Sequence, residues 1–277
     1  MNTYPDLIAE PAAVPVLPGP EQPLSPDARQ TKIPDTFSGP GRLTDLVATR
    51  NDPLGRAIRA CLDRYEAQAF AAGIRLELQT DFHHLAEINP HLEKAPLTPQ
   101  FDPEISDIGP VNGFWLKGVD TRGEVVQTQA VRLDNLDGTS LALHLKSLKA
   151  FYRNPAESAH ARETCTVEAP AAYGITGRVG YHGEFWVKGG RSGYRGHDLA
   201  VVLPRIGMAL ALARWSPDFM YGTIQPAIAE KGIVARYGYH NLQPHGIIWT
   251  LPQSDQVLDE WLMWMSWRDM VDLIERS

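Results

Sequence analysis

The sequence predicts an α/β fold in which a mixed, partly parallel central sheet is flanked by helices. Three observations predict it. Runs that alternate apolar and polar residues, or that are rich in aromatic and β-branched residues, have strand character. From Arg178 onward these runs are separated by stretches with helical spacing, as parallel strands require. Earlier in the chain, two strand-like runs are joined by a short turn, as in an antiparallel hairpin.

Composition narrows the class of protein. The chain has 277 residues, 43% hydrophobic and 21% charged, which suits a folded protein with a sizeable core. The formal net charge is −7 and the basic residues are dispersed, so we expect no nucleic-acid partner and no membrane partner. The sequence shows no basic segment followed by an apolar run at its start and no apolar run of 18 residues, so we expect neither a secretion signal nor a membrane-spanning helix. The two cysteines, Cys61 and Cys165, lie far apart in the sequence. These features predict a cytoplasmic protein without a disulfide framework or zinc site.

The first half of the chain divides into an arm and the start of a domain. Residues 1–42 are rich in proline and predict a flexible arm, followed by a single domain over 43–277 with an inserted helical segment at about 136–177. Asp52 and Pro53 predict the start of a helix that runs to about Ala72, with Gly73 as its stop. We expect a strand over 74–80, a short helix over 81–88, and a hairpin of strands 113–118 and 124–133 around the turn 120–123.

The second half alternates strands and helices. Leucines at helical spacing predict a helix from Leu141 to Tyr152, before the breaker Asn154-Pro155. We then expect a strand over 180–188, a glycine-rich turn, a helix to Trp215, a strand over 219–225, a helix over 227–236, a strand over 246–251, and an apolar run over 261–265 before a short charged helix. In that apolar run, strand alternation places Trp261 and Met263 on one face and Leu262 and Trp264 on the other, as core or dimer-interface packing. Aromatic strands near the C-terminus would suit a homodimer.

The turn between the strand at 180–188 and the following helix carries the clearest chemical signal. Its sequence from Gly189 is Gly-Gly-Arg-Ser-Gly-Tyr-Arg-Gly-His-Asp-Leu-Ala200. The first N–H groups of a helix lack intrahelical acceptors, glycines allow the backbone to approach a ligand, and Arg191 and Arg195 add positive charge. Such a turn is suited to a phosphate or pyrophosphate, although Arg191 and Arg195 could instead pair with Asp198, and His197 could be an exposed turn residue.

Here the sequence resembles the GNAT superfamily of acyl-CoA N-acyltransferases. The family signature, Arg/Gln-x-x-Gly-x-Gly/Ala between a strand and a long helix, is matched by Arg195-Gly-His-Asp-Leu-Ala200, and a strand, a helix and Arg236-Tyr-Gly-Tyr239 follow in the family's order. The resemblance extends over about 74–267 and implies a GNAT-like fold that takes acetyl-CoA or another acyl-CoA as co-substrate, without a metal. It assigns the co-substrate site to residues of the turn and its flanks, namely Val187, Arg191, Gly193, Arg195, Gly196, His197, Asp198 and Ala200.

Acyl transfer to an amine requires a base and a proton donor for the leaving thiolate. Glu184, on the strand before the turn, is the candidate base, and a solvated strand carboxylate is the alternative. Tyr237 and Tyr239 are candidate proton donors; a tyrosine beside a glycine at a helix end can equally pack its ring and bond a loop. The acceptor would be a small-molecule or peptide amine that the sequence does not identify.

Three departures from the family pattern keep a second function open. Asp198 occupies the position of the middle glycine, where its side chain could cap the helix and compete with phosphate. Pro204 predicts either a kink or a helix that starts there, and Val234 occupies the position of the family's general-acid tyrosine. The two functions are therefore an acyl-CoA-dependent N-acetyltransferase-like acyltransferase and a non-catalytic GNAT-like binding or regulatory module. An aminoacyl transferase that uses charged tRNA is disfavoured by the acidic balance, and His83, His84 and His91 lack the spacing of a metal site.

Overall fold

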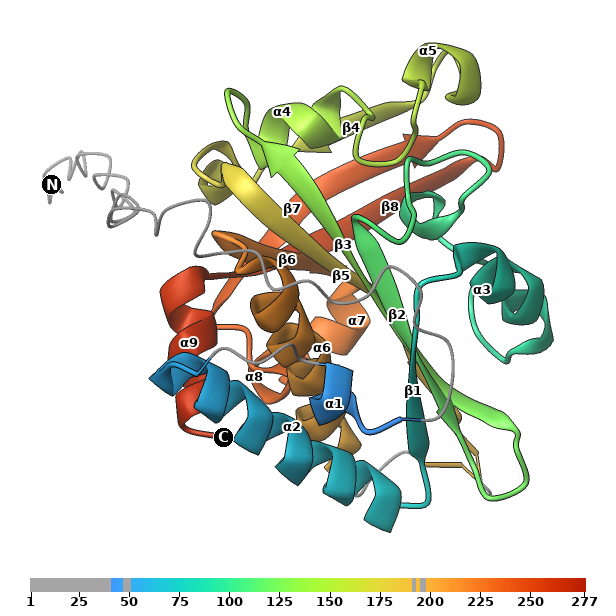
Figure 1. Ribbon diagram of the computed structural model, residues 1–277. Coiled ribbons are helices and arrows are strands. Elements are labelled where there is room, and N and C mark those ends of the chain that lie inside the picture. The colour runs from blue at the N-terminus through green and yellow to red at the C-terminus, as the bar shows by residue number, and fades with distance from the viewer. Residues whose placement is uncertain (1–40, 47–50, 191–192, 195–197) are drawn as a thin grey trace, which may run out of the picture.

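Figure 1 shows the computed structural model, in which residues 41–46, 51–190, 193–194 and 198–277 are described. One eight-stranded sheet has the order β1-β2-β3-β5-β6-β8-β7-β4. Its neighbouring strands are antiparallel except for β5 and β6, which are parallel. Helices cover both faces, so the predicted α/β class with a mixed, partly parallel sheet is confirmed. The arm predicted over 1–42 lies almost wholly outside the described residues, and the domain division stays a prediction.

The bounds of the elements are as follows. The strands are β1 Arg75–Gln79, β2 Gly113–Val119, β3 Val125–Leu136, β4 Thr164–Val167, β5 Gly177–Val187, β6 Phe219–Ile224, β7 Asn241–Leu251 and β8 Gln256–Ser266. The α-helices are α1 Leu43–Leu46, α2 Pro53–Ala71, α3 Phe82–Ile88, α4 Leu141–Lys146, α5 Pro155–Ser158, α6 Leu199–Trp215, α7 Pro226–Ala229, α8 Ile233–Tyr237 and α9 Trp267–Glu275. The 3₁₀-helices are η2 Asn89–His91, η3 Pro99–Phe101 and η4 Pro170–Tyr173.

The first face of the sheet is covered by α1, α2, α6, α8 and α9 (Figure 1). As predicted, α2 begins at Pro53, with the Asp52 carboxylate accepting the Gly55 N–H at 2.7 Å. Helix α6 lies between the sheet and α2 and is buried along nearly its whole length. A helix that is apolar on all sides is the expected occupant of such a central layer.

The second face is covered by α3, η3, α4 and η4, with β4 at the edge of the sheet beside β7. Segment 136–177 contributes α4 and η4 to this face and also contains α5 and β4. Its buried Glu163 carboxylate accepts hydrogen bonds from the Tyr152 hydroxyl and the Trp249 indole N–H, both at 2.8 Å. The bond from Trp249 ties the segment to β7.

Two predicted helices differ in length from the structure. The helix expected over 141–152 ends at Lys146, because Leu148 adopts a left-handed backbone with φ of 60°. The helix expected over 227–236 is divided into α7 and α8 by Gly232, which has φ of 71°. Apolar residues continue at helical spacing past Leu148 and Gly232, so this spacing predicted helices that are longer than those of the structure.

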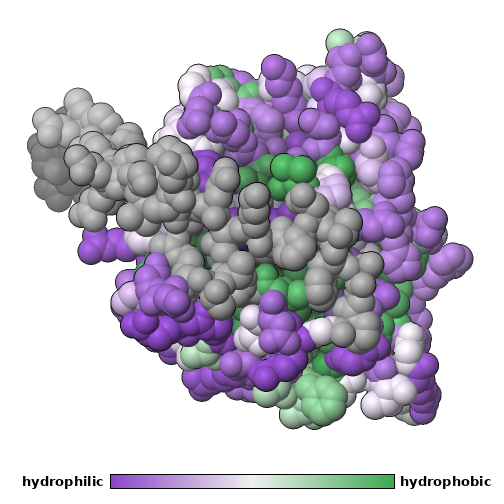
Figure 2. Space-filling model, viewed as in Figure 1, coloured by the Kyte–Doolittle hydropathy of each residue, from purple (hydrophilic) through white to green (hydrophobic). Residues whose placement is uncertain are grey.

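The last strand confirms the predicted alternation. In β8, Trp261 and Met263 pack with the core of the first face, whereas Leu262 and Trp264 pack with the core of the second. No described helix is long and apolar enough to cross a membrane. Figure 2 shows a mostly hydrophilic surface in this view, with apolar residues gathered toward its middle.

Candidate functional site

The candidate site lies where β5 and β6 separate. Only three residue pairs join these parallel strands, Val179 to Tyr181 on β5 with Phe219 to Tyr221 on β6. Within the described strands, β5 continues to Val187 beside β3 and β6 continues to Ile224 beside β8, without further pairing to each other. Open α/β sheets bind ligands at the carboxyl ends of strands where neighbouring connections diverge.

A β-bulge in the pairing of β5 with β3 bends β5 at this point. The register between β3 and β5 shifts between Thr128 and Ala130, and Glu184 has φ of 55°, which is unusual for a residue other than glycine. The Thr128 hydroxyl donates to the Glu184 carbonyl oxygen at 3.0 Å and so satisfies one backbone group of the bulge. Bulges and strained backbone of this kind are over-represented beside active sites.

The Glu184 side chain is buried and already holds several partners. One carboxylate oxygen pairs with Lys94 Nζ, and the other accepts from the Thr98 N–H at 2.9 Å and the Thr98 hydroxyl at 2.7 Å. The expectation that it would be a solvated strand carboxylate if it were not a base is therefore wrong. Its assignment as a base stays a prediction, and its contacts tie loop 89–101 to β5.

A buried chain of polar side chains runs from α6 to the start of β7. Gln129 Nε2 donates to the Leu203 carbonyl oxygen at 2.8 Å, Gln129 Oε1 lies 3.0 Å from His182 Nε2, and His182 Nδ1 lies 3.4 Å from the Tyr239 hydroxyl. Burial lowers the pKa of His182 to about 4 and raises the pKa of Tyr239 well above its usual value. His182 is therefore neutral near pH 7.

Tyr237, the other predicted proton donor, lies beside the part of β5 that does not pair with β6. Its ring packs against Phe185, with ring centroids 4.9 Å apart, and α8 ends directly after it at Gly238, which has φ of 102°. Val234, in the preceding turn of α8, is buried in the first core. Tyr237 and Tyr239 thus pack with the first core, whereas the Glu184 carboxylate contacts the loop 89–101.

The glycine-rich turn is only partly described. Arg191, Arg195, Gly196 and His197 lie outside the described residues, so their predicted contacts are untested. Val187 is the buried last residue of β5, and Gly193 approaches the Gly189 carbonyl so closely that a side chain there would collide with it. Ala200 lies in the first turn of α6.

Asp198 behaves differently from the expectation for a capping residue. It precedes α6 with φ of 55°, its side chain makes no capping hydrogen bond, and its Oδ1 lies 3.5 Å from Arg236 Nη2. The prediction that its side chain could cap the helix is therefore wrong. Pro204 lies inside α6, so the helix does not begin there. The N-terminus of this 17-residue helix keeps the dipole and N–H groups that favour an anion.

A second polar group lies on the opposite face of the same strands. Burial raises the pKa of Glu260 on β8, while a hydrogen bond from Thr223 on β6 acts in the opposite direction. Tyr181 on β5 interacts with Thr223 and Glu260, and burial raises its pKa.

Sequence reasoning missed the residues that build the interior of this site. Lys94, Gln129, His182 and Glu260 were not singled out because each is an isolated polar residue in a stretch that otherwise has ordinary strand or loop character. The available signal was the run Val-Val-Gln-Thr-Gln-Ala at 125–130, where polar residues interrupt a strand in the middle of the sheet. Polar groups at such positions require buried partners.

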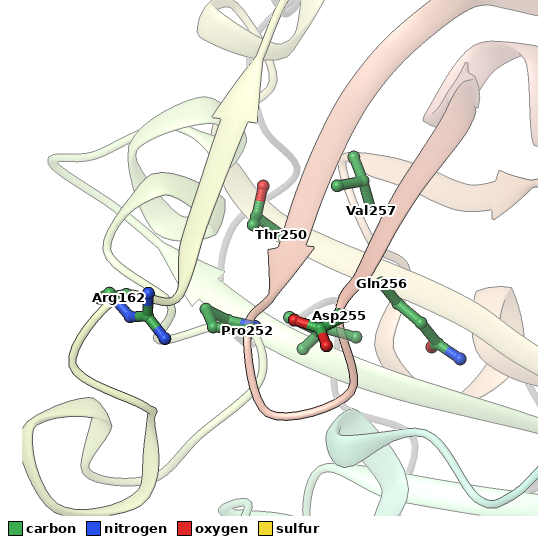
Figure 3. A pocket seen from close by; sticks show the side chains of 7 residues that line it. Arg162, Thr250, Pro252, Asp255, Gln256 and Val257 are labelled. Carbon is green, nitrogen blue, oxygen red and sulfur yellow. The ribbon is translucent and has the colours of Figure 1, made fainter.

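A separate depression of about 320 Å³ lies at the turn between β7 and β8 (Figure 3). It is lined by Arg162, Thr250, Leu251, Pro252, Asp255, Gln256 and Val257. These residues are at the end of the hairpin remote from the part of β8 that pairs with β6. No group of three or more potential metal ligands occurs among the described residues.

Comparisons with known proteins find likeness only in structure. No family model matches the chain, and no curated protein matches its sequence. A spermidine N-acetyltransferase variant from Vibrio cholerae is 8% identical, with 71% of this chain and 96% of that chain covered and a TM-score of 0.38. An N-acyl amino acid synthase from uncultured soil microbes is 13% identical, with 80% and 95% covered and a TM-score of 0.34.

A third solved structure is a GNAT-family acetyltransferase from Bacillus anthracis. It is 9% identical, with 70% of this chain and 96% of that chain covered and a TM-score of 0.34. It is described as a member of the superfamily that the turn and helix motifs resemble. TM-scores below 0.5 indicate neither an activity nor a ligand for this chain.

Proposed function

We propose that the protein is an acyl-CoA-dependent acyltransferase, N-acetyltransferase-like in its chemistry, that moves an acyl group from the CoA thioester to an amine. The observation that carries the proposal is the parallel pair β5–β6, which separates after three residue pairs beside a bulge in β5. This arrangement leaves strand edges available to a ligand at the point where α6 begins. It combines an extended backbone edge with an anion-favouring helix end, which suits a long co-substrate with a phosphate-bearing part.

The phosphate part would be held by the turn before α6. Arg191, Arg195 and His197 supply positive or donor groups, and Gly193, Gly196 and Ala200 leave the backbone accessible. Asp198 does not occupy the helix N–H groups and its charge is shared with Arg236. Acetyl-CoA is the simplest co-substrate of this kind, and Val187 would line its path along β5.

The reacting end would lie beside Tyr239 and Tyr237. Tyr239 has its hydroxyl near Gly222, immediately after the last residue of β6 that pairs with β5. Hydroxyl groups at such a position can exchange a proton with the reacting groups. The acceptor is proposed to be a small-molecule or peptide amine, and the protein is proposed to act in the cytoplasm, either as a monomer or as a homodimer.

One observation favours the non-catalytic alternative. Glu184, the predicted base, is already paired with Lys94 and Thr98, so a protein that binds acyl-CoA without turnover is the second candidate. The two candidates differ in turnover and agree in binding.

Calorimetric titration with CoA and acetyl-CoA tests the binding that both candidates require. We expect saturable binding by the wild-type protein and loss of at least tenfold in affinity in Arg195→Ala, because a charge-assisted phosphate contact contributes about 1.5–3 kcal/mol. Arg162→Ala is the matched control, since this exposed arginine borders the remote depression of Figure 3. Absence of binding by the wild type would contradict the proposed function. Binding without release of CoA in the presence of a panel of primary amines would favour the binding module.

A further inference from the structure

The hydrogen bonds around Gln129 fix which nitrogen of His182 carries the proton. The Gln129 amide nitrogen must be the atom that faces the Leu203 carbonyl, because two acceptors would repel each other. Gln129 Oε1 is then the atom that faces His182 Nε2, at 3.0 Å. Only a protonated Nε2 can donate to that oxygen. The neutral imidazole therefore carries its proton on Nε2 and has a lone pair on Nδ1.

This tautomer determines the direction of the next bond. Nδ1 can only accept, so the Tyr239 hydroxyl donates its single proton to His182, 3.4 Å away. The lone pairs of the Tyr239 oxygen are then available to a partner other than His182. In the resting protein the Tyr239 oxygen is therefore an acceptor toward any further partner, whereas the sequence predicted that Tyr239 acts as a donor.

Two glycines leave space for the hydrogen-bonded side chains of Gln129, His182 and Tyr239. A Cβ at position 207 of α6 would lie 2.9 Å from Gln129 Oε1, and a Cβ at position 222 of β6 would lie 3.0 Å from the His182 carbonyl oxygen and 3.6 Å from the Tyr239 hydroxyl. Gly222 directly follows the last β6 residue that pairs with β5. The Tyr239 end of the chain is therefore at the site where the strands separate, and the Gln129 end is against α6.

We propose that Gln129, His182 and Tyr239 form a proton relay that serves both halves of the acyl transfer. This inference rests on the proposed function. As the amine nitrogen bonds to the acyl carbon, Tyr239 takes a proton from that nitrogen and passes its own proton to His182 Nδ1. Gln129 Oε1 holds the resulting imidazolium through the Nε2–H bond. His182 then returns the proton through Tyr239 to the sulfur as the carbon–sulfur bond breaks. The products are an amide and a thiol, and the net change is one proton moved from nitrogen to sulfur.

The surroundings of the relay explain why the proton is held only briefly. His182 is buried and its pKa is lowered to about 4 by that burial, so the charged imidazole is unfavourable at neutral pH. A group that readily gives up the proton again is suited to the second half of the reaction, in which the leaving sulfur needs it. Gln129 is a positioning residue in this scheme, while Tyr239 contacts the reacting groups.

The test compares His182→Asn and Tyr239→Phe with the wild type. It measures the release of CoA thiol from acetyl-CoA in the presence of a panel of primary amines. An asparagine at 182 places an amide oxygen near the position of Nδ1, so it can still accept from Tyr239 but cannot hold a proton. A role limited to accepting the Tyr239 hydrogen bond would therefore survive this substitution. Because general acid–base catalysis contributes about 10²- to 10⁴-fold, we expect kcat to fall by at least 100-fold in both variants, with little change in KM for acetyl-CoA. The double variant should lose no more than the single ones, since both remove one relay.

Tyr152→Phe provides the matched control. It removes the hydroxyl of another buried tyrosine, whose bond to Glu163 lies in segment 136–177, and kcat should stay within about twofold of the wild type. If His182→Asn kept the kcat of the wild type and only Tyr239→Phe were defective, the relay would be overturned and the proposed function would stand. No thiol release by the wild type with any amine would instead overturn the proposed function, and the relay with it.

A nitrogen NMR spectrum of the free protein tests the relay without any turnover. We expect the His182 ring to carry its proton on Nε2 at pH 7 and its Nδ1 signal to shift in Tyr239→Phe. A proton on Nδ1 would overturn the relay whatever the activity of the protein.

Discussion

The buried ion pair between Lys94 and Glu184 connects the loop 89–101 with the bulge in β5, and its removal gives the largest stability effect that we expect near the site. The Lys94 and Glu184 side chains are 8% and 2% exposed. Replacing Lys94 with methionine keeps the length of the side chain and removes the charge. The Glu184 carboxylate would then remain buried with only the two Thr98 donors, at 2.9 and 2.7 Å.

Breaking one side of a buried ion pair costs about 3–5 kcal/mol, because an uncompensated charge is left away from water. For a domain of roughly 150–250 residues, each kcal/mol lowers Tm by about 2–4 °C. We therefore expect Lys94→Met to lower Tm by roughly 6–20 °C. Adding Glu184→Gln should recover part of this loss, because the double variant no longer buries a charge.

Urea unfolding followed by tryptophan fluorescence, together with calorimetry, measures both variants. Lys188→Met is the matched control: Lys188 pairs with Glu124 at the exposed end of the same strand region, and we expect its loss to change stability little. A loss of less than about 1 kcal/mol in Lys94→Met would refute the reasoning, since the carboxylate would then have found water or another partner.

Three further predictions concern the interior. The folded-state pKa of His182, about 4, is below its ordinary value of 6.5, so between these pH values the unfolded chain binds a proton that the folded protein does not. The free energy of unfolding should therefore be highest above pH 6.5 and fall by roughly 3 kcal/mol by pH 4. Urea unfolding across this range should show a weaker pH dependence in His182→Asn. Burial raises the thiol pKa of Cys61 and Cys165 to about 12. A thiol reagent at pH 8 should therefore label neither cysteine in the folded protein and both in urea. Rapid labelling of the folded protein would contradict their burial. Gly207→Ala should destabilise α6 by about 1–3 kcal/mol despite the better helix propensity of alanine, because the new methyl group displaces Gln129; an increase in Tm would show that Gln129 moves without cost.

Much of the fold could be predicted because local patterns agree with the final structure. Asp52 and Pro53 begin α2 as expected, the 113–133 hairpin forms, and the alternation at 261–264 divides correctly between the two cores. The errors come from the backbone. Leu148 and Gly232 end or divide helices through positive φ angles that hydrophobic spacing does not reveal.

The candidate site was less accessible to sequence reasoning. Tyr237 and Tyr239 were found because they belong to a motif, and the structure places them beside Phe185 of β5 and Gly222 of β6, where these two strands no longer pair. Lys94 and His182 depend on contacts with residues 90 and 53 positions away in the sequence, and no local pattern reports such partners. The bulge at Glu184 could not be predicted from the local sequence either, because it arises from the pairing of β5 with β3.

Mass analysis of the acceptor tests acyl transfer most directly. The wild-type protein would be incubated with acetyl-CoA and a panel of primary amines, and acylated amine and released CoA thiol would be measured together. The proposed transferase predicts an amine that gains the acyl group in equal amount to the CoA released, and a strong reduction of both in Tyr239→Phe. CoA release without an acylated amine, or no release above the protein-free reaction, would contradict acyl transfer to an amine.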